Sequence, residues 1–255
     1  PDVIVAPLCY SRYVLAVQRF AIKTAEIPAV TYVYDDLYSL RQFRLSPLYW
    51  LNRFLLRGAI RKTMPLYQFA YTMTEQQAQE YQKYFDLPLK VLRKGAQISC
   101  RQTIKHEGVR LIYAGGIYYG RDRTLVKVAD AVRKLREEGN DVELHIYTGS
   151  PLKRKMEIPL NDGAASFVHP AVSAGELARR YDESDIALHV ESFQKKNALL
   201  TRLSFSTKIV DCLASGCAVL AICPSINAGW QYLKENDGAL CVEKLATVEN
   251  AVRAL

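Results

Sequence analysis

A pair of glycines followed by basic residues is the first group that could do chemistry. Gly115 and Gly116 come directly after an apolar run, residues 109–114. Arg121 and Arg123 follow the glycines and precede the expected helix 124–138. Glycines let backbone amides approach a phosphate closely, and the N-terminus of a helix presents the positive end of its dipole. These residues predict a phosphate site, with an ordinary turn as the alternative.

A second turn of this kind follows the next apolar run, residues 142–147, and contains Gly149 and Ser150. In a parallel sheet this turn lies beside the first one, at the carboxyl ends of the strands, where ligands bind. A second contact to the same ligand is therefore expected, and an ordinary strand-to-helix turn is again the alternative.

A lysine and an aspartate near the start of a predicted helix form the third candidate. Ser206 or Thr207 can cap this helix. Lys208 and Asp211, three residues apart, are expected to share its exposed face near the N-terminus. The cation suits a diphosphate and the carboxylate suits a ribose hydroxyl, whereas an ion pair within the helix is the alternative.

The elements that must position these residues alternate between short strand-like runs and longer helical patterns, which is typical of βαβ units and a parallel sheet. In the first part the expected strands are 3–6, 29–34, 68–73 and 89–93, and the expected helices are 11–26, 47–62 and 74–85. The polar segment 95–108 interrupts the pattern, and we place a domain boundary there.

The second part has enough strands and helices for a complete doubly wound sheet. The expected strands are 109–114, 142–147, 166–168, 186–190, 218–222 and 238–242, and the expected helices are 124–138, 175–183, 207–215, 226–235 and 246–255. Helix 124–138 is the clearest, because Leu125, Val128 and Val132 follow the spacing of one apolar face. Gly139 suits its C-terminal cap.

The composition is that of a globular protein. Hydrophobic residues make up 49% of the chain and charged residues 24%, and the apolar runs are far shorter than the roughly 20 residues of a membrane span. The chain opens on a strand pattern without a basic leader, so we expect no signal peptide. The cysteines form no CxxC pair and the histidines lack metal-ligand spacing, so we expect a reducing cytoplasm and no bound metal.

An excess of positive charge indicates anionic partners. The formal net charge is +8, which suits nucleic acid, an acidic membrane surface or a phosphate-bearing substrate. Between Arg41 and Lys62, cations alternate with aromatic and leucine side chains. This stretch predicts a surface helix whose apolar face packs on its own sheet. Docking on an anionic membrane, with Arg53, Arg57 and Arg61 toward the lipid, is the alternative.

The stretch 204–221 resembles a segment of the glycosyltransferase family four group, whose pattern is S-K-x-x-E-x-(L/M)-A-x-G-x-P-V. Lys208 matches the lysine of the pattern, Asp211 stands where the family usually has glutamate, and Ala218 replaces the usual proline. The first glycine turn is similar to the family's Y-x-G-x-(x)-x-x-K-G loop. Gly116 stands where the family often has arginine, and Arg121 or Arg123 replaces its lysine.

Similar passages extend over nearly the whole chain. Residues 168–181, which include His169 and Pro170, resemble a passage whose loop often contacts the nucleobase. Residues 185–190 resemble a strand of the family, and 71–74 with 91–96 resemble the run that closes its acceptor domain. Asp35 and Asp36 sit where the family often has His-Asp.

The resemblance implies an α/β protein of the GT-B fold with two Rossmann-like parallel-sheet domains. Residues 1–100 would form a partial N-terminal acceptor-side domain, and residues 107–255 would form the C-terminal donor-binding domain. The family has further βα units before the strand that resembles 2–6, so we expect the first domain to be incomplete.

The implied reaction is transfer of a sugar, with retention, from a nucleotide-diphosphate donor such as a UDP-sugar to a lipid-linked or polysaccharide acceptor. No metal or other cofactor and no nucleic-acid partner are expected. A non-catalytic GT-B-like nucleotide-binding subunit and a GT-B epimerase or phosphorylase are the alternatives. A cytoplasmic location is expected, and attachment to the inner face of the membrane is compatible with the basic stretch.

The resemblance also implies roles for individual residues. The catalytic group would be Arg121, Lys208 and Asp211. Asp35 and Asp36 would line the acceptor side. The donor-binding residues would be Gly115, Gly116, Arg123, Gly149, Ser150, His169, Pro170, Ser206 and Thr207.

Overall fold

The structure, a computed structural model, describes residues 2–96 and 106–254. The chain divides into two compact units. Unit 1 comprises Pro1–Lys94 and Leu199–Phe205, and unit 2 comprises Gly95–Ala198 and Ser206–Leu255. Residues 97–105, which form most of the expected boundary segment, lie outside the described residues.

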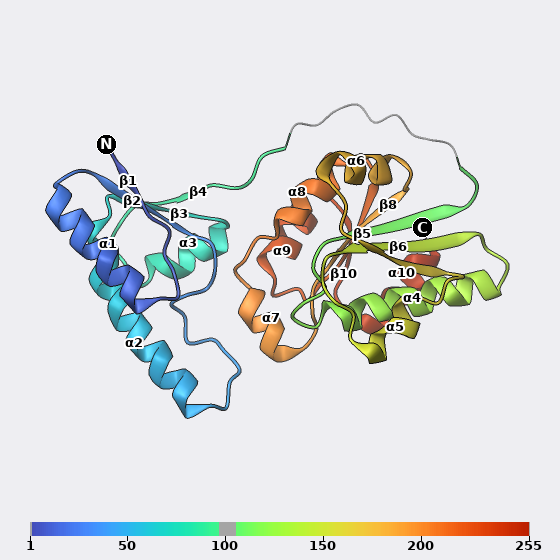
Figure 1. The fold of residues 1–255 in the computed structure, drawn as a ribbon, viewed down its shortest axis with the longest axis horizontal. Coiled ribbons are helices and arrows are strands. Elements are labelled where there is room, and N and C mark those ends of the chain that lie inside the picture. The colour runs from blue at the N-terminus through green and yellow to red at the C-terminus, as the bar shows by residue number, and fades with distance from the viewer. Residues whose placement is uncertain (1, 97–105, 255) are drawn as a thin grey trace. The chain divides into compact units, whose positions relative to one another are not determined.

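Unit 1 is built on a parallel four-stranded sheet with the order β1-β2-β3-β4 (Figure 1). The strands are β1 (Ile4–Val5), β2 (Ala29–Val33), β3 (Phe69–Thr72) and β4 (Leu89–Val91). The helices are α1 (Arg12–Ala25), α2 (Pro47–Thr63), the short 3-10 helix η1 (Met64–Leu66) and α3 (Glu75–Gln82). These strands and α-helices are the ones that the sequence predicts, with ends that differ by a few residues.

Polar caps and apolar rows explain the helices of unit 1. Ser11, Ser46 and Thr74 each accept a hydrogen bond from the backbone N–H three residues on, which fixes the first turn of the helix that follows. Right-handed connections between neighbouring parallel strands place α1 and α2 side by side on one face of the sheet (Figure 1). Leu15 of α1 and Ile60 of α2 are fully buried in the core beneath them.

Unit 2 is built on a parallel six-stranded sheet with the order β10-β9-β8-β5-β6-β7 (Figure 1). The strands are β5 (Val109–Ala114), β6 (Val142–Thr148), β7 (Ser166–Pro170), β8 (Ile186–Val190), β9 (Ala218–Ile222) and β10 (Leu240–Val242). The helices are α4 (Arg121–Glu137), α5 (Arg154–Leu160), α6 (Ala174–Asp182), α7 (Lys195–Thr201), α8 (Thr207–Ala214), α9 (Ala228–Glu235), η2 (Leu245–Thr247) and α10 (Val248–Arg253). The last three residues of α7 belong to unit 1.

Side chains of the central strand β5 alternate between cores on opposite faces of the sheet of unit 2. Leu111 and Tyr113 lie in a core with α4, whereas Ile112 lies in a core with α6 and α8. The apolar row predicted for α4 is buried as expected. Gly139, with a φ of 91°, follows the end of this helix in the left-handed conformation that suits a C-terminal cap.

The direction in which strands are added reverses between β5 and β8. From β5 the chain moves outward through β6 and β7, and then adds β8, β9 and β10 on the other side. In sheets of this type the loops after the two central strands diverge, and ligands bind between them. In unit 2 these loops begin at Gly115 and Glu191.

Helices α5 and α7 were not predicted from the sequence. Each buries a single side chain, Leu160 in α5 and Ala198 in α7, and α5 also contains Pro159. A short helix without an apolar row leaves no periodic signal. Within the described residues, no helix is long and apolar enough to cross a membrane.

Candidate functional site

The predicted phosphate-binding turns lie at the carboxyl edge of the sheet of unit 2. Ala114, Tyr147 and His169 are register partners across β5, β6 and β7. The glycine turn after β5 and the turn after β6 therefore begin at nearly the same level. Ser150 joins the two turns, because its Oγ accepts a 3.2 Å hydrogen bond from the backbone N–H of Ile117.

Lys208 crosses the edge of this sheet directly over Gly115. A Cβ atom at Gly115 would lie 2.1 Å from Lys208 Cε, and Gly115 has a φ of 139°, which L side chains rarely adopt. Helix α8 packs on one face of the sheet, whereas Lys208 Nζ donates a 3.0 Å hydrogen bond to Tyr113 Oη, from the core on the other face. Gly115 thus provides the path that Lys208 takes across the sheet.

The surroundings of Lys208 lower the pKa of its ammonium group to about 8. Burial is the main cause, and the positive charge of Arg121 adds to it. Burial also raises the pKa of Tyr113, so its hydroxyl stays neutral and donates a 2.7 Å hydrogen bond to the carbonyl of Gly116. Burial removes part of the hydration of this ammonium group. An anionic ligand that binds it offsets this loss through charge-assisted hydrogen bonds.

Arg121 forms a bidentate ion pair with Glu191. Its Nη2 and Nε atoms lie 2.7 Å and 3.1 Å from the two carboxylate oxygens of Glu191, which is buried. Burial opposes the charge of Arg121, but the adjacent carboxylate outweighs it and raises the pKa of the guanidinium. The pair fixes Arg121 between α4 and the loop after β8. Arg123, by contrast, is exposed.

The start of α8 differs from its expected arrangement in one respect. Ser206 is the N-cap residue and Thr207, exposed, is the first residue of the helix. Lys208 and Asp211 were expected on an exposed face, yet both are half-buried. The side chain of Lys208 extends away from α8 and crosses the edge of the sheet. The periodicity of residues along one helix could not predict this contact with another segment.

His169 belongs to a row of stacked rings on β6 and β7. Its ring centre lies 4.6 Å from that of Tyr147 and 5.3 Å from that of His145. Burial lowers the pKa of His169, and His145 adds to this effect. These rings, with Pro170 and Arg180, line a pocket of about 390 Å³. Flat rings beside a guanidinium suit a planar heteroaromatic ligand.

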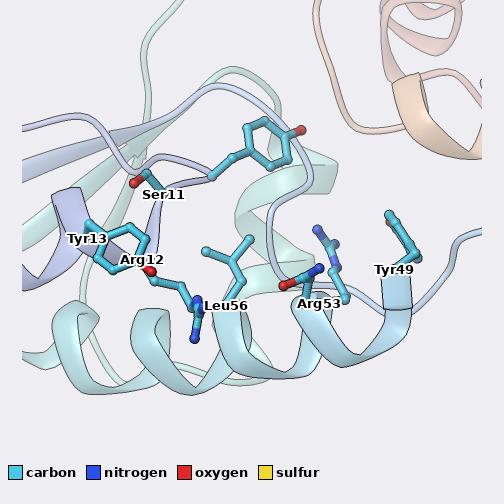
Figure 2. Close-up of a pocket in the computed structure, with 8 residues that line it drawn as sticks. Ser11, Arg12, Tyr13, Tyr49, Arg53 and Leu56 are labelled. Carbon is cyan, nitrogen blue, oxygen red and sulfur yellow. The ribbon is translucent and has the colours of Figure 1, made fainter. Parts of the chain in front are cut away.

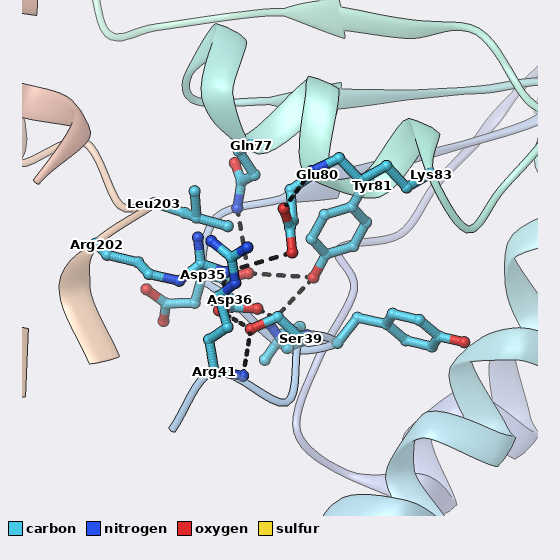
Figure 3. Close-up of polar contacts among 12 residues, drawn as sticks. Asp35, Asp36, Ser39, Arg41, Gln77, Glu80, Tyr81, Lys83, Arg202 and Leu203 are labelled. Atoms are coloured by element: carbon cyan, nitrogen blue, oxygen red, sulfur yellow. Dashed lines mark hydrogen bonds and ion pairs between the residues drawn. The ribbon is translucent and has the colours of Figure 1, made fainter. Parts of the chain in front are cut away.

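Asp36, predicted for the acceptor side, is fully buried in unit 1 (Figure 3). Its carboxylate lies 3.1 Å from Arg202 Nη2 and accepts hydrogen bonds from the backbone and the side chain of Ser39. Arg53 Nη2 lies 3.7 Å away. The geometry gives Asp36 a structural task, because it holds the segment 199–205 in unit 1.

Asp35 is the more accessible carboxylate of the pair. It is half-exposed, and its Oδ1 accepts a 2.9 Å hydrogen bond from Ser204 Oγ. Its backbone carbonyl is held by Gln77 Nε2 at 3.2 Å, as Figure 3 shows. Of the two aspartates, Asp35 is the one that a ligand can reach.

Unit 1 also contains a pocket of about 470 Å³ between the first turn of α1 and helix α2 (Figure 2). Arg12 and Tyr13 line it from α1, Tyr49 lines it from α2, and Tyr10 precedes the first helix. A guanidinium binds phosphate and carboxylate groups, and aromatic rings offer flat apolar faces. This pocket can therefore take a ring-shaped ligand that bears an anionic group.

Sequence reasoning missed Glu191 and Tyr113. Glu191 directly follows a strand of five buried residues, and an acidic side chain at that place is a signal that could have been read. Tyr113 lies inside an apolar run and gives no such signal. His189 is also buried near this edge, and burial lowers its pKa to about 4, so the ring is neutral. Among the described residues, no group of three metal-ligating side chains occurs.

The chain matches no protein-family model and no curated protein. Its fold matches that of TarM with a TM-score of 0.71 at 12% identity, over 99% of this chain and 47% of TarM. It also matches the pneumococcal O-GlcNAc transferase GtfA in complex with UDP and GlcNAc, with a TM-score of 0.64 at 14% identity, over 92% of this chain and 46% of GtfA.

A third similar structure is the α,α-trehalose-phosphate synthase (UDP-forming) from Burkholderia vietnamiensis. The TM-score is 0.63 at 11% identity, over 94% of this chain and 62% of the synthase. These matches confirm the predicted GT-B fold with two parallel-sheet domains. The chain spans about half to three fifths of the length of these proteins.

The crossing of Lys208 over Gly115 can be tested by substitution. Gly115→Ala should destabilise the protein by more than the roughly 1–2 kcal/mol of left-handed strain alone, because the new Cβ meets Lys208. Gly163→Ala is the control, since Gly163 has a φ of 71° with open space around its Cβ position. In denaturant unfolding, Lys208→Ala should partly rescue Gly115→Ala. Equal losses at the two glycines, or no rescue, would refute the crossing.

If Asp36 holds the segment 199–205, Arg202→Met should lower the free energy of unfolding by about 3 kcal/mol. The substitution removes a partner of the Asp36 carboxylate and leaves its charge buried. Asp36→Asn should reduce this loss in the double variant. Arg253→Met, which breaks an exposed pair with Glu138, should leave the melting temperature nearly unchanged. If Arg202→Met is equally harmless, the buried pair does not hold the segment.

Proposed function

We propose that the chain is part of a glycosyltransferase that takes its sugar from a nucleotide-diphosphate donor bound by unit 2. The observation that carries this proposal is the position of Lys208, which places a partly buried ammonium group over the glycine turn where the strand order reverses. This is the place where open α/β sheets bind ligands. The GT-B fold of the similar structures supports the proposal.

In the proposed reaction, the bond between the anomeric carbon and the diphosphate oxygen breaks, and the oxygen of an acceptor hydroxyl bonds to that carbon with retention. The hydroxyl gives its proton to the leaving diphosphate. The leaving diphosphate gains negative charge, and Lys208, the amides of the glycine turn and the N-terminus of α4 would stabilise it. Arg121, fixed by Glu191, adds a positive charge beside Lys208. No metal is required in this scheme.

We propose a uridine diphosphate sugar as the donor. GtfA was solved with UDP, and the trehalose-phosphate synthase is described as UDP-forming. In the present chain, the pocket beside His169 and Pro170 would take the base, and Asp211 would bind a ribose or sugar hydroxyl. Thr207, exposed at the start of α8, and Gly149, exposed after β6, would contact the phosphates.

On the acceptor side we propose a lipid-linked or polysaccharide acceptor that reaches Asp35. The pocket between α1 and α2 supports this proposal, since Arg12 and Tyr13 offer a cation and a flat ring to a glycan that carries an anionic group (Figure 2). Asp36 would contribute indirectly, by keeping Asp35 and its loop in place.

The second candidate is a nucleotide-binding subunit without transfer activity. The bidentate ion pair between Arg121 and Glu191 favours it. A guanidinium held in this way has less freedom to follow a leaving group. Release of free UDP from a UDP-sugar separates the candidates. A transferase releases UDP faster when acceptor is added, whereas a binding subunit releases none under either condition.

Lys208→Met tests the donor site, because methionine keeps the aliphatic packing and removes the charge. The loss of a charge-assisted hydrogen bond should weaken UDP binding by about 1.5–3 kcal/mol, roughly ten- to a hundredfold, measured by calorimetry. Lys127→Met, at an exposed lysine of the same unit, is the control. Normal UDP binding combined with an earlier melting transition would make Lys208 a structural residue and remove the proposed site.

The lowered pKa of Lys208 predicts opposite effects of pH on binding and on stability. As pH rises through about 8, the ammonium loses its charge and UDP affinity should fall. Between about 8 and the ordinary lysine pKa of about 10.4, the unfolded state binds more protons, so the Lys208 contribution to stability should rise with pH. Both trends, measured by calorimetry and thermal melting, should disappear in Lys208→Met. Their persistence would assign them to another group.

A further inference from the structure

The outer side of helix α2 carries exposed apolar side chains. Leu48, Leu51 and Leu55 follow the i, i+3, i+7 spacing of one helical stripe and are 66%, 56% and 43% exposed. On another side of the helix, Leu56 and Ile60 are buried against the core of unit 1. Packing of α2 on the sheet of unit 1 therefore explains its buried apolar side but not its exposed leucine stripe.

The loop before α2 adjoins this stripe and also exposes apolar side chains. Leu45 is 90% exposed, and Leu40 and Phe43 are exposed as well. Trp50 Nε1 donates a 2.9 Å hydrogen bond to the backbone carbonyl of Arg44, which fastens the loop to the first turns of the helix. The loop is thus held in one conformation while its apolar side chains remain in water.

Two of the arginines to which the membrane alternative assigned lipid binding donate hydrogen bonds within unit 1 instead. Arg53 is buried and donates hydrogen bonds to the backbone carbonyls of Asp36 and Ser39, and Arg57 donates to that of Tyr38. The expectation that Arg53 contacts lipid is therefore wrong. Helix α2 itself therefore supplies donors for the backbone carbonyls of residues 36, 38 and 39, which lie just before the loop.

The charge along this segment of the sequence has a single sign. From Leu37 to Thr74 the sequence contains six arginines and lysines and no acidic residue. Arg41, Arg61 and Lys62 are exposed. A surface that combines a leucine stripe with cations and lacks acidic groups complements the interface of an anionic membrane, where acyl chains lie beneath phosphate groups.

Helix α1 also exposes apolar side chains. It lies on the same face of the sheet as α2, and Arg19 Nη1 joins the two by a 3.0 Å hydrogen bond to Thr63 Oγ1. Val17 and Phe20 are exposed on its outer side, and α1 contains no acidic residue. Exposed apolar side chains without neighbouring acidic residues in sequence thus occur on both helices.

We propose that the loop 40–46 and the outer side of α2 dock on a bilayer that contains anionic lipid. The leucine stripe enters the interface, Arg41 and Lys62 contact headgroup phosphates, and Trp50 lies at the boundary, where aromatic rings are favoured. The inference rests on unit 1 alone and does not depend on the donor site. Docking would bring the chain to the surface on which lipid-linked acceptors are found.

The test is sedimentation of the chain with vesicles of phosphatidylcholine, with and without phosphatidylglycerol. Binding should require the anionic lipid and should weaken as salt rises, because headgroup attraction is screened. Leu48→Ser combined with Leu51→Ser should reduce binding at least tenfold. Arg41→Gln combined with Lys62→Gln should also reduce it at least tenfold, since each basic residue near an anionic surface contributes about fivefold.

Matched controls come from exposed residues of unit 2. Ile158→Ser removes a side chain that is 79% exposed, and Arg154→Gln with Lys155→Gln removes two exposed cations. Neither variant should change vesicle binding, and all variants should melt near the unaltered chain. If the controls weaken binding equally, or the anionic lipid makes no difference, the proposal fails. It also fails if Leu48→Ser with Leu51→Ser converts a dimer, seen by light scattering, to a monomer without affecting vesicle binding.

Discussion

The passage of one lysine side chain across the edge of a parallel sheet is the constraint on which the candidate site depends. Lys208 begins in a helix on one face and ends at the hydroxyl of Tyr113, which belongs to the core of the other face. Only a residue without a Cβ leaves room for it at position 115. The reversal of strand order provides the place, since the loops on either side of it diverge. Burial along this path then lowers the pKa of the lysine.

Unit 1 depends on a different kind of interaction, a buried ionic cluster around Asp36. Arg202 and Arg53 approach one carboxylate, and Arg202 also lies 3.6 Å from Glu80. Burying these charges is costly unless they are paired and hydrogen-bonded, so the cluster fixes the segment 199–205 in one arrangement. Arg53 of this cluster also binds the backbone carbonyls of Asp36 and Ser39, just before the loop that leads to α2.

The two units therefore offer different chemistry. Unit 2 presents glycine amides, a lysine and a fixed arginine at one edge of a sheet, which suits a diphosphate. Unit 1 presents an aromatic and basic pocket beside an apolar, basic helix surface, which suits a glycan acceptor and a lipid interface. The positive charge of the chain suits both proposed partners, because diphosphates and anionic lipids attract cations through the same phosphate groups.

The sequence by itself determined the α/β class, the strands and most of the helices, because apolar periodicity and capping residues such as Ser206 and Gly139 are local properties. It also singled out Gly115 and Lys208, since a glycine after a strand and a cation at the start of a helix can both be read from the linear sequence. Only the tertiary structure decided that these two residues meet, that Glu191 pairs with Arg121, and that Asp36 is buried. These are contacts between segments distant along the chain, and they depend on strand order, which local patterns do not encode.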